Sequence, residues 1–374
     1  MTVPFLDLGA AYRELDAEIN AAVDRVLRSG QYILGPEVEA FESEWATFCG
    51  ASHCVGVGNG LDALTLSLRA LDIGPGDEVI VPSHTFIATW LAVAAVGATL
   101  VPVEPDPQTC NLDPSRVEAA ITPRTRALLP VHLYGAPAAL APLQQLARAH
   151  GLALVEDAAQ AHGAQYHGTP VGAHGDLVCW SFYPGKNLGA LGDAGAVTTR
   201  DPALAARLRE MRNYGSSVKY VHEHLGVNSR LDPLQAAVLR VKLRHLPDWN
   251  RRRERIARRY RAELQDLSLQ FQHSLPDTAS SHHLFVVRTA QRDVLQAALA
   301  RRGIQTLIHY PIPPHQQGAF AGLGWSADAF PLARTLAQSV LSLPIGPQLT
   351  DSDVDQVVAA VHDSLRGACH PAPA

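Results

Sequence analysis

Short apolar runs alternate with segments of helical spacing between residues 53 and 200, and this alternation leaves few possible folds. The apolar runs suit buried strands, and the segments between them repeat apolar residues with the period of a helix. Strands that are joined by helices form parallel βαβ units. We therefore expect an α/β fold with a mostly parallel central sheet covered by helices on both faces. Strands are predicted at 53–57, 78–81, 99–103, 127–131, 152–156, 177–182 and 194–199, and helices at 61–71, 85–96, 114–121 and 140–150.

The chain beyond residue 200 has fewer parallel-type runs. A helix is predicted at 202–213 and a longer one at 233–264, which Pro247 should break or kink because proline lacks the backbone N–H. We place a domain boundary there, between a large domain of residues 1–248 and a smaller α+β domain of residues 249–374. The smaller domain should contain a strand at 283–287 and helices at 294–302, 329–342 and 351–365.

Charge, apolar runs and cysteine spacing argue against a nucleic-acid-binding, membrane-spanning or disulfide-bonded protein. The 374 residues carry a net charge of −5, which gives no electrostatic reason to expect nucleic acid. The arginine-rich segment 251–261 is interpreted as a solvated helix face. No apolar run reaches the ~18 residues of a membrane span, and the acidic start does not resemble a signal peptide. The five cysteines are odd in number and lack CxxC spacing, which predicts reduced thiols in a cytoplasmic protein.

Lys186 and Asp157 are the residues that most clearly suggest chemistry. Lys186 follows the run 177–182 in a glycine-rich loop, and Asp157 ends the run 152–156. Ligands of open parallel sheets bind beyond the carboxyl ends of the strands. A lysine and a carboxylate there suit pyridoxal phosphate, because the amine can carry the aldehyde and the carboxylate can hold the ring nitrogen. Burial should lower the pKa of the lysine, which can then act as nucleophile and base.

Other turns after predicted strands could complete such a site. Gly60 and Leu61 open a helix whose free N–H groups could bind phosphate, and the hydroxyl of Ser181 could join them. Phe86 could stack on a flat ring, and Gln160 could donate to its phenolic oxygen. Taken singly, each has an ordinary alternative, such as a capped helix start or a core phenylalanine. Their joint order and spacing favour one aromatic, phosphorylated cofactor.

Three segments carry a resemblance to a known family: EDAAQAHGA at 156–164, SFYPGKNLGALGDAGAV at 181–197 and NSRLDPLQAA at 228–237. They resemble the sugar aminotransferases of the DegT/DnrJ/EryC1/StrS family, whose fold is fold-type I of the pyridoxal-phosphate enzymes. The likeness extends from FLDL at 5–8 to IHYPIPPHQQ at 308–317, which is nearly the whole chain.

The resemblance implies a role for each matching residue. Lys186 would be the Schiff-base lysine and Asp157 the partner of the pyridine nitrogen, with pyridoxamine 5'-phosphate as the intermediate form of the cofactor. Gln160, Phe86 and the phosphate cradle of Gly60, Leu61 and Ser181 match cofactor-binding positions of the family. Asn228 matches an asparagine that reaches the cofactor phosphate of the neighbouring subunit, which implies a homodimer with shared active sites.

The implied reaction moves an amino group from L-glutamate to a keto group of a nucleotide-linked sugar. Family members that act at C4 tend to have histidine in place of Gln160, whereas those that act at C3 resemble this chain. We therefore expect a 3-keto substrate, most simply dTDP-3-keto-6-deoxyhexose. Tyr183, His309 and Tyr310 are candidates for the sugar side of the site. A packed interdomain loop is the alternative explanation for the last two.

Four other functions fit parts of the sequence. A pyridoxamine-dependent sugar dehydratase of the same fold would carry histidine in place of Lys186, and a regulator without activity would not need the intact set. A metal hydrolase is suggested only by the 17 histidines, which lack ligand spacing and are interpreted as scattered solvent-facing residues, including His282 and His283. We expect no metal site. A nucleotide-binding dehydrogenase would need a glycine-rich dinucleotide turn.

Overall fold

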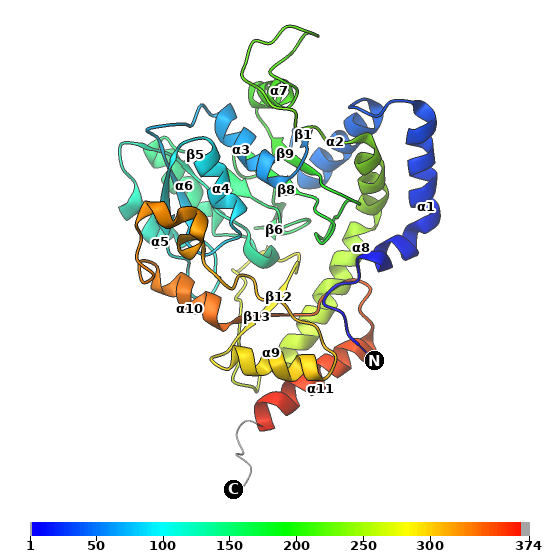
Figure 1. Cartoon of the computed structure of the whole chain (residues 1–374), viewed down its shortest axis with the longest axis vertical. Helices are drawn as coiled ribbons and strands as arrows, with labels where there is room; N and C mark the ends of the chain where they lie inside the picture. Colours follow the sequence, from blue (N-terminus) through cyan, green and yellow to red (C-terminus); the bar gives the residue numbers. More distant parts are fainter. Residues whose placement is uncertain (1, 368–374) are drawn as a thin grey trace.

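The computed structural model describes residues 2–367 and has the α/β architecture that the sequence predicts (Figure 1). A seven-stranded sheet has the order β1-β9-β8-β5-β4-β2-β3, and all its pairs are parallel except the two that β9 makes with β1 and β8. Its strands are β1 (His53–Val57), β2 (Glu78–Pro82), β3 (Thr99–Val103), β4 (Thr125–Leu128), β5 (Ala153–Asp157), β8 (Leu177–Ser181) and β9 (Gly195–Thr199).

Helices cover both faces of this sheet because successive strand residues point to opposite sides. In β2, Val79 and Val81 pack in one core, while Ile80 between them packs in another. The first core includes residues of α3 (Gly60–Ala70), α4 (Ala88–Ala95) and α7 (Pro202–Met211). The opposite face is covered by α2 (Pro36–Cys49), α5 (Pro114–Val117), α6 (Leu140–His150) and the first half of α8 (Pro233–Leu264). The predicted helix at 85–96 starts later, at Ala88.

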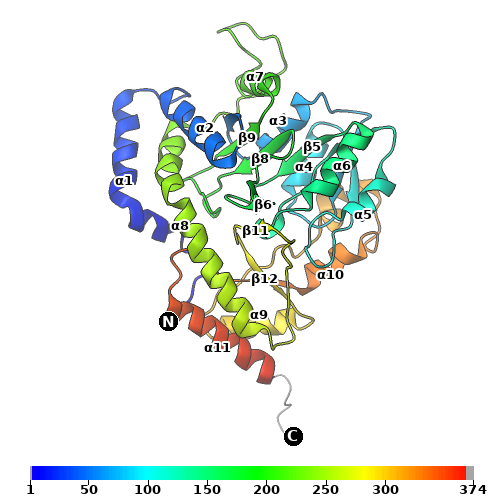
Figure 2. The same cartoon turned by 180° about the vertical axis from the view of Figure 1, so that it is seen from behind.

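The long helix α8 runs from the seven-stranded sheet into the lower lobe, the part of the chain around the second half of α8 (Figure 2). It does not end at Pro247, so of the predicted break or kink, the break is wrong. Pro247 is exposed, whereas its neighbours Leu246 and Trp249 are buried. Packing of these neighbours holds the chain helical through a residue that disfavours it. Helix α1 (Leu8–Ser29) lies along the first half of α8, and the two share a hydrophobic core.

The lower lobe is built on a three-stranded sheet of order β10-β12-β13, formed by Gln270–Phe271, Phe285–Arg288 and Val340–Leu343. It packs with the second half of α8 and with α9 (Arg292–Arg301) and α11 (Asp351–Gly367). The helix predicted at 329–342 is α10 (Pro331–Ser339), and its last part is β13 instead. The run Val340–Leu343 is apolar enough for a helix or a strand, and its pairing with β12 makes it a strand. The domain boundary at residue 248 stays a proposal.

Smaller elements complete the described chain. A third sheet joins β6 (Gln165–Tyr166), β7 (Thr169–Pro170) and β11 (Thr278–Ala279), and short 3₁₀ helices occupy Glu118–Ala120, Leu133–Gly135, Pro314–Gln316 and Gly318–Leu323. Four buried cysteines are free thiols, as predicted, and Cys369 lies outside the described residues. Among residues 2–367, no helix combines the length and apolar character needed to cross a bilayer.

Candidate active site

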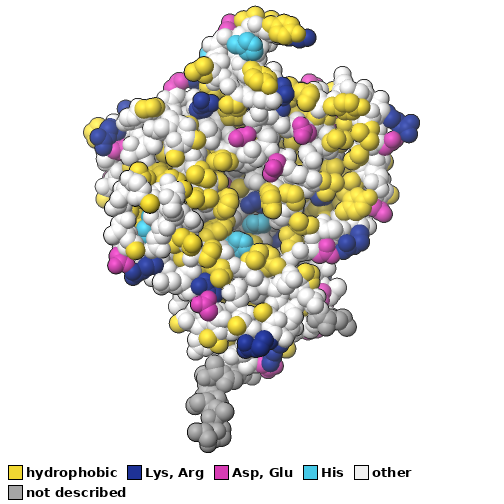
Figure 3. Space-filling model, in the orientation of Figure 1, with side chains coloured by type: hydrophobic (Ala, Val, Ile, Leu, Met, Phe, Trp, Pro, Cys, Tyr) yellow, Lys and Arg dark blue, Asp and Glu magenta, His cyan; other side chains and the backbone are white. Residues whose placement is uncertain are grey.

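A cavity of about 1370 Å³ opens where the carboxyl ends of β2, β5 and β8 face the lower lobe. Figure 3 shows the hollow near the middle of this face, with basic and histidine side chains among hydrophobic ones. The strand order places β5 beside β8, with Asp157 paired to Cys179, so residues that follow these strands are neighbours. The cavity is lined by every predicted site residue except Asn228, namely Gly60, Leu61, Phe86, Asp157, Gln160, Ser181, Tyr183, Lys186, His309 and Tyr310.

Lys186 lies in the loop between β8 and β9. Its backbone N–H donates to the carbonyl of Tyr183 at 2.8 Å, which makes a tight turn. Its amine has no hydrogen-bond partner among residues 2–367. Burial lowers the pKa of Lys186 to about 8, although the nearby charge of Asp157 opposes the shift. At neutral to mildly alkaline pH, a substantial fraction of this amine is therefore neutral and able to act as a nucleophile.

Asp157 is buried and presents its carboxylate to the same cavity. One oxygen accepts a hydrogen bond from the Thr89 hydroxyl at 2.9 Å, and the other accepts one from the N–H of Ala159 at 3.1 Å. Burial raises the pKa of Asp157, and both hydrogen bonds act against that rise. Asp157 has no salt-bridge partner among the described residues, Lys186 included. A cation in the cavity would supply the missing counter-charge.

The start of α3 offers a phosphate cradle. The backbone N–H groups of Gly60 and Leu61 have no acceptor within the described part of the chain, while Asn59 caps the helix by accepting from the N–H of Asp62 at 2.8 Å. A Cβ atom on Gly60 would lie 2.6 Å from the Cβ of Ser181, so only glycine allows the helix start to approach that side chain. Free N–H groups at a helix start beside a hydroxyl suit an anion.

Gln160 connects the end of β5 to the loop at 308–317. Its side-chain amide donates to the hydroxyl of Tyr310 at 2.9 Å and accepts from the backbone N–H of Tyr134. The ring of Tyr310 also lies near Phe86, with centroids 5.4 Å apart and planes tilted by 39°. Phe86 is half exposed at 51 %, so its face is open to a ring in the cavity rather than packed in the core.

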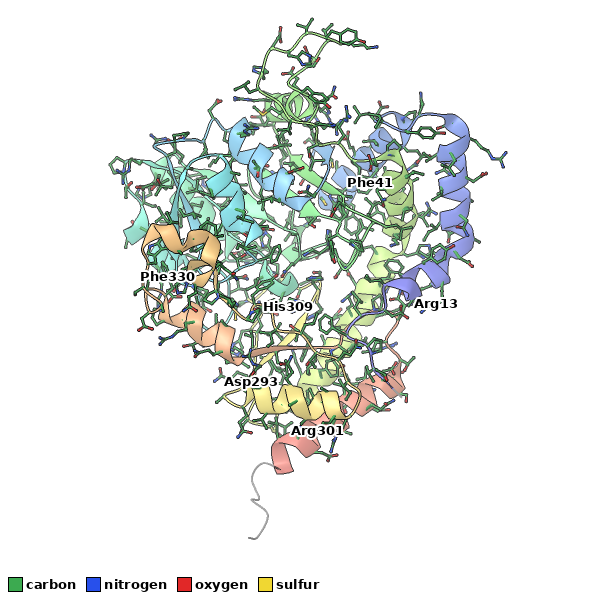
Figure 4. The ribbon with its side chains drawn as sticks, viewed as in Figure 1. Arg13, Phe41, Asp293, Arg301, His309 and Phe330 are labelled. Atoms are coloured by element: carbon green, nitrogen blue, oxygen red, sulfur yellow. The ribbon has the colours of Figure 1, made fainter. Side chains whose placement is uncertain are left out.

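The two remaining sugar-side candidates occupy different parts of the cavity wall. Tyr183 is 58 % exposed and follows β8, whereas His309 lies between the sheet and the lower lobe (Figure 4). His309 pairs with the hydroxyl of Ser342 at 2.8 Å. Burial, together with the charge of Lys186, lowers the pKa of His309 to about 4, so its ring is neutral at physiological pH.

Asn228 is exposed and lies apart from the cavity. It pairs with Asn213 in an isolated β-bridge at the base of the loop that follows α7. That loop projects from the top of the molecule in Figure 1. Within this chain alone, Asn228 therefore does not reach the site.

Three functional residues were not predicted: Arg253 and His283, which line the cavity, and Thr89, which lies behind it and bonds to Asp157. Thr89 lies one helical turn after Thr85, in the segment that also supplies Phe86, and this spacing was the available signal. Arg253 belongs to the arginine-rich segment, which was wrongly interpreted as entirely solvated, because its side chain is only 3 % exposed. His283 was expected to face solvent but lines the cavity, where its ring pairs with Asn187 at 3.2 Å.

The residues present fit pyridoxal phosphate. Asp157 is a buried carboxylate without a counter-charge, Lys186 is an amine without an acceptor, and a phosphate cradle opens at Gly60. In the described residues, no group of three or more histidine, cysteine or acidic side chains could hold a metal ion. The arrangement can therefore support amine chemistry on a bound aldehyde.

Known proteins resemble this chain over nearly its whole length. The model of the DegT/DnrJ/EryC1/StrS aminotransferase family matches residues 13–362. The chain is 60 % identical to the erythromycin biosynthesis sensory transduction protein EryC1 of Saccharopolyspora erythraea, covering 96 % of this chain and 99 % of the relative. It is 58 % identical to the dTDP-3-amino-3,4,6-trideoxy-alpha-D-glucose transaminase of Streptomyces venezuelae, covering 96 % of each chain.

A solved structure agrees with these relatives. S. venezuelae DesV in complex with a ketimine intermediate superposes with a TM-score of 0.96 at 57 % identity, covering 97 % of this chain and 98 % of the other. Further structural neighbours were solved with bound pyridoxamine phosphate or in the pyridoxal phosphate form. The chain is therefore a pyridoxal-phosphate-dependent aminotransferase and belongs to the DegT/DnrJ/EryC1/StrS aminotransferase family.

Proposed function

We propose that this enzyme transfers the amino group of L-glutamate to the C3 keto group of a nucleotide-linked sugar, of which dTDP-3-keto-6-deoxyhexose fits best. The observation that carries the proposal is the pair of Lys186 and Asp157, an amine and a carboxylate that face one cavity without bonding to each other. The S. venezuelae relative at 58 % identity, named as a dTDP-3-amino sugar transaminase, supports the choice of C3 and of a dTDP sugar.

Different residues would bind the phosphate of the cofactor and its ring. When bound, pyridoxal phosphate supplies an aldehyde that accepts the amino group and a ring that withdraws electrons from the reacting carbon. The N–H groups of Gly60 and Leu61, with the Ser181 hydroxyl, would hold the phosphate, and Phe86 would stack on the ring. Asp157 would keep the ring nitrogen protonated, and the Thr89 hydroxyl at 2.9 Å would hold the carboxylate in place.

Lys186 would act twice in each half of the reaction. Its amine, whose lowered pKa favours the neutral form, would hold the cofactor through the aldehyde. When a donor amine occupies that position, the free Lys186 amine would act as the base that takes the proton from the donor α-carbon, and the resulting ammonium as the acid that gives it back. With the keto sugar, the same amine would move a proton in the opposite direction.

The sugar would lie against the 308–317 loop. Tyr310, tethered to Gln160 at 2.9 Å, together with His309 and Tyr183, offers hydroxyl and ring groups at the mouth of the site. Because hydrogen-bonding side chains can discriminate between sugars that differ at one hydroxyl, this wall is the proposed origin of specificity. The alternative is a C4 aminotransferase, which would turn over a 4-keto sugar instead.

We further propose a homodimer in which Asn228 completes the active site of the partner subunit. The loop after α7 supports this, because it projects from the body and exposes Tyr220 (83 %) and Leu225 (88 %). Apolar side chains at such exposure are typical of a surface that a partner covers. Asn228 lies at the base of this loop, outside the cavity of its own chain.

Two other functions are less well supported. A sugar dehydratase of this fold would have histidine in place of Lys186. The S. erythraea relative is named a sensory transduction protein, but a purely regulatory protein would not need an amine of lowered pKa in the cavity. Cytoplasmic location and the two-domain division stay predictions from the sequence.

Product analysis tests the proposal. The holoenzyme is incubated with L-glutamate and one keto sugar at a time. The three sugars are dTDP-3-keto-6-deoxyglucose, its galacto epimer and dTDP-4-keto-6-deoxyglucose. We expect a 3-amino sugar and stoichiometric 2-oxoglutarate from a 3-keto substrate. Turnover of the 4-keto sugar alone would refute the C3 assignment, and turnover with L-glutamine but not L-glutamate would refute the donor.

A further inference from the structure

His283 lines the active-site cavity, but the proposed reaction gives it no role. It lies in the segment just before β12, and it shares the wall of the main cavity with Lys186. Its ring pairs with the side chain of Asn187, the residue next to Lys186. His283 is therefore bonded to the loop that carries the reacting amine.

The amide of Asn187 is held in one orientation by its neighbours. The side chain is 4 % exposed, and its Nδ2 donates to the carbonyl of Ser281 at 2.7 Å and to Oδ1 of Asn250 at 3.0 Å. A backbone carbonyl can only accept, so the amide nitrogen must face Ser281. Asn250 is oriented in the same way, because its Nδ2 donates to the carbonyl of His162 at 2.8 Å. Both amide hydrogens of Asn187 are thus used, and its Oδ1 faces His283.

This orientation fixes the tautomer of His283. Nδ1 of the ring lies 3.2 Å from Oδ1 of Asn187, which can only accept, so Nδ1 carries the proton and donates it to this bond. The other nitrogen of a neutral ring, Nε2, is then a bare acceptor. Nε2 pairs with no atom of residues 2–367. It is not sealed in the core, as the unpaired nitrogens of His162 are, so it opens onto the cavity.

The surroundings of His283 keep its ring neutral. Burial lowers the pKa of His283 well below its ordinary value, and the charges of Lys186 and Arg253 lower it further. The rings of His309 and His162 act in the same direction. No salt bridge joins His283 to a carboxylate of the described chain. Nε2 therefore stays an acceptor at physiological pH.

Lys186 is the donor that fits this acceptor. Its amine has no hydrogen-bond partner in the described part of the chain, and its charge affects the pKa of His283 more than any other charge does. As the base of the proposed reaction, Lys186 holds an extra proton after it takes one from the substrate. An ammonium in a buried cavity is costly unless hydrogen bonds stabilise it. A bare ring nitrogen beside it supplies such a bond.

The other charged and titratable groups around Lys186 are less suited to this role. They are Asp7, Asp157, His162, Lys242, Arg253 and His309. The two basic groups cannot accept a hydrogen bond. Asp157 is proposed to hold the cofactor ring nitrogen, and Asp7 is bound by Arg13. With His162 sealed in the core, His309 is the rival acceptor that an experiment must separate from His283.

We propose that Nε2 of His283 accepts a hydrogen bond from the Lys186 ammonium, and that Asn187 orients the ring for this bond. His283 is thus a positioning residue, which holds the amine between its two proton transfers. The proton stays on Lys186, so no covalent bond to His283 forms or breaks. The inference rests on the proposed function only in requiring Lys186 as the base, and it does not depend on which sugar carbon is aminated.

Two substitutions separate the two nitrogens of the ring. In His283→Asn, the side-chain amide can replace Nδ1 and still donate to Asn187, but nothing replaces Nε2. The longer side chain of His283→Gln can place its amide oxygen near the position of Nε2. His282→Asn is the matched control, because His282 is the adjacent residue and does not line the cavity. Its φ of 46° is one that asparagine tolerates.

The first measurement uses the apoenzyme and needs no amino donor. The rate constant for binding pyridoxal phosphate is measured from about pH 5 to about pH 10, and the midpoint of the profile reports the protonation of Lys186. An acceptor at Nε2 favours the ammonium, so its loss favours the neutral amine. We expect the midpoint to fall by about one pH unit in His283→Asn, as for loss of a hydrogen bond to a charged group. His283→Gln should lie between this value and the wild type, and His282→Asn should match the wild type.

The second measurement follows the L-glutamate half-reaction of the holoenzyme by stopped-flow absorbance. Without Nε2 the ammonium is less stable, so proton transfer should slow roughly tenfold in His283→Asn. Deuterium at the α-carbon of L-glutamate should then slow the variant more than it slows the wild type, since proton transfer limits the rate more strongly. The KM for the keto sugar should change less than about threefold.

Each alternative gives a different result. An unchanged midpoint in His283→Asn, or an equal shift in His282→Asn, would overturn the inference. A shift in His309→Asn but not in His283→Asn would assign the acceptor to His309 and overturn it as well. A loss confined to the KM for the keto sugar would show that Nε2 faces the sugar instead of Lys186.

Two further results are also decisive. If His283→Asn does not fold, His283→Phe, which keeps a ring without nitrogens, takes its place with the same expected shift and the same contradicting result. A wild-type enzyme whose absorbance does not respond to L-glutamate would overturn the proposed donor alone. The apoenzyme profile uses no donor, so it would still decide the role of His283.

Discussion

The side-chain amide of Gln160 donates a hydrogen bond of 2.9 Å to the hydroxyl of Tyr310, across 150 positions of sequence. This bond ties the segment after β5, whose last residue is Asp157, to the loop that we propose as the sugar side of the cavity. The residue proposed to lie beside the cofactor and the proposed sugar-binding wall are thus joined by a hydrogen bond. A change at Gln160 should therefore affect the choice of sugar more than the reaction with the amino donor.

Tyr310→Phe removes this bond while keeping the ring. We expect kcat/KM for the keto sugar to fall roughly tenfold, whereas bleaching of the cofactor absorbance by L-glutamate should stay within about twofold. Gln160→Met removes the side-chain amide on the other side of the bond, and with it the acceptor for the backbone N–H of Tyr134. In a double-mutant cycle of unfolding free energies, the two changes should couple by about 1 kcal/mol. Additive effects would show that the bond contributes nothing.

Removal of the Asp157 carboxylate should slow both half-reactions. Asp157→Asn preserves size but cannot stabilise a protonated ring nitrogen, so the rate of the L-glutamate half-reaction should fall roughly 10²- to 10³-fold, a typical loss for one preorganised electrostatic group. Thr89→Val removes only the supporting hydrogen bond and should cost much less. Stopped-flow absorbance measures both. Equal losses in the two variants would contradict the assigned roles.

The phosphate cradle depends on the absence of a side chain at Gly60. In Gly60→Ala, the added Cβ would lie 2.6 Å from Ser181, so Ser181 and the helix start must move apart. We expect the Kd for pyridoxal phosphate to rise at least about tenfold, measured by fluorescence titration of apoenzyme. Gly318→Ala, where nothing lies within 4 Å of the new atom, is the control and should leave the Kd unchanged. Equal affinity in both variants would place the phosphate elsewhere.

Reconstitution of the apoenzyme should depend on pH through Lys186. Its pKa of about 8 lies below the ordinary value, so the reactive neutral form increases as pH rises and saturates above about 8. The rate constant for binding pyridoxal phosphate should therefore rise up to about tenfold per pH unit between pH 6 and 7 and level off above pH 8. A rise that continues to pH 10 would show an unperturbed lysine.

Much of the fold and the place of most candidate site residues could be predicted because they depend on local patterns. Asp157 and Lys186 follow apolar strands, and the sheet brings such positions to one edge whatever the details of packing. The strand Val340–Leu343 could not be predicted, since its identity depends on pairing with β12. The course of α8 through Pro247 depends likewise on tertiary packing around it.

Arg253 illustrates the same limit at the level of the site. In sequence it is one of several arginines at helical spacing. It shares the helix face of Trp249, Ile256 and Tyr260, which the exposed Arg251 and Arg255 do not, but a shared face does not show what covers it. Only the docking of α8 against the carbonyls of His282, His283 and Ile345 buries this one side chain. Long-range contacts therefore decide which member of a charged run becomes part of the site.

The most direct test of the central claim is to identify the lysine that carries the cofactor. The chain offers a rival, because Lys242 is also buried, has a pKa lowered to about 8, and lines the small cavity beside Lys186. Its amine, however, donates to the carbonyl of Gly189 at 2.7 Å, whereas that of Lys186 has no acceptor in the described chain. The holoenzyme is reduced with borohydride, digested and analysed by peptide mass spectrometry. We predict one phosphopyridoxyl group on the peptide containing Lys186, retained in Lys242→Met and absent in Lys186→Ala; a label on Lys242, or no label on any lysine, would contradict the account.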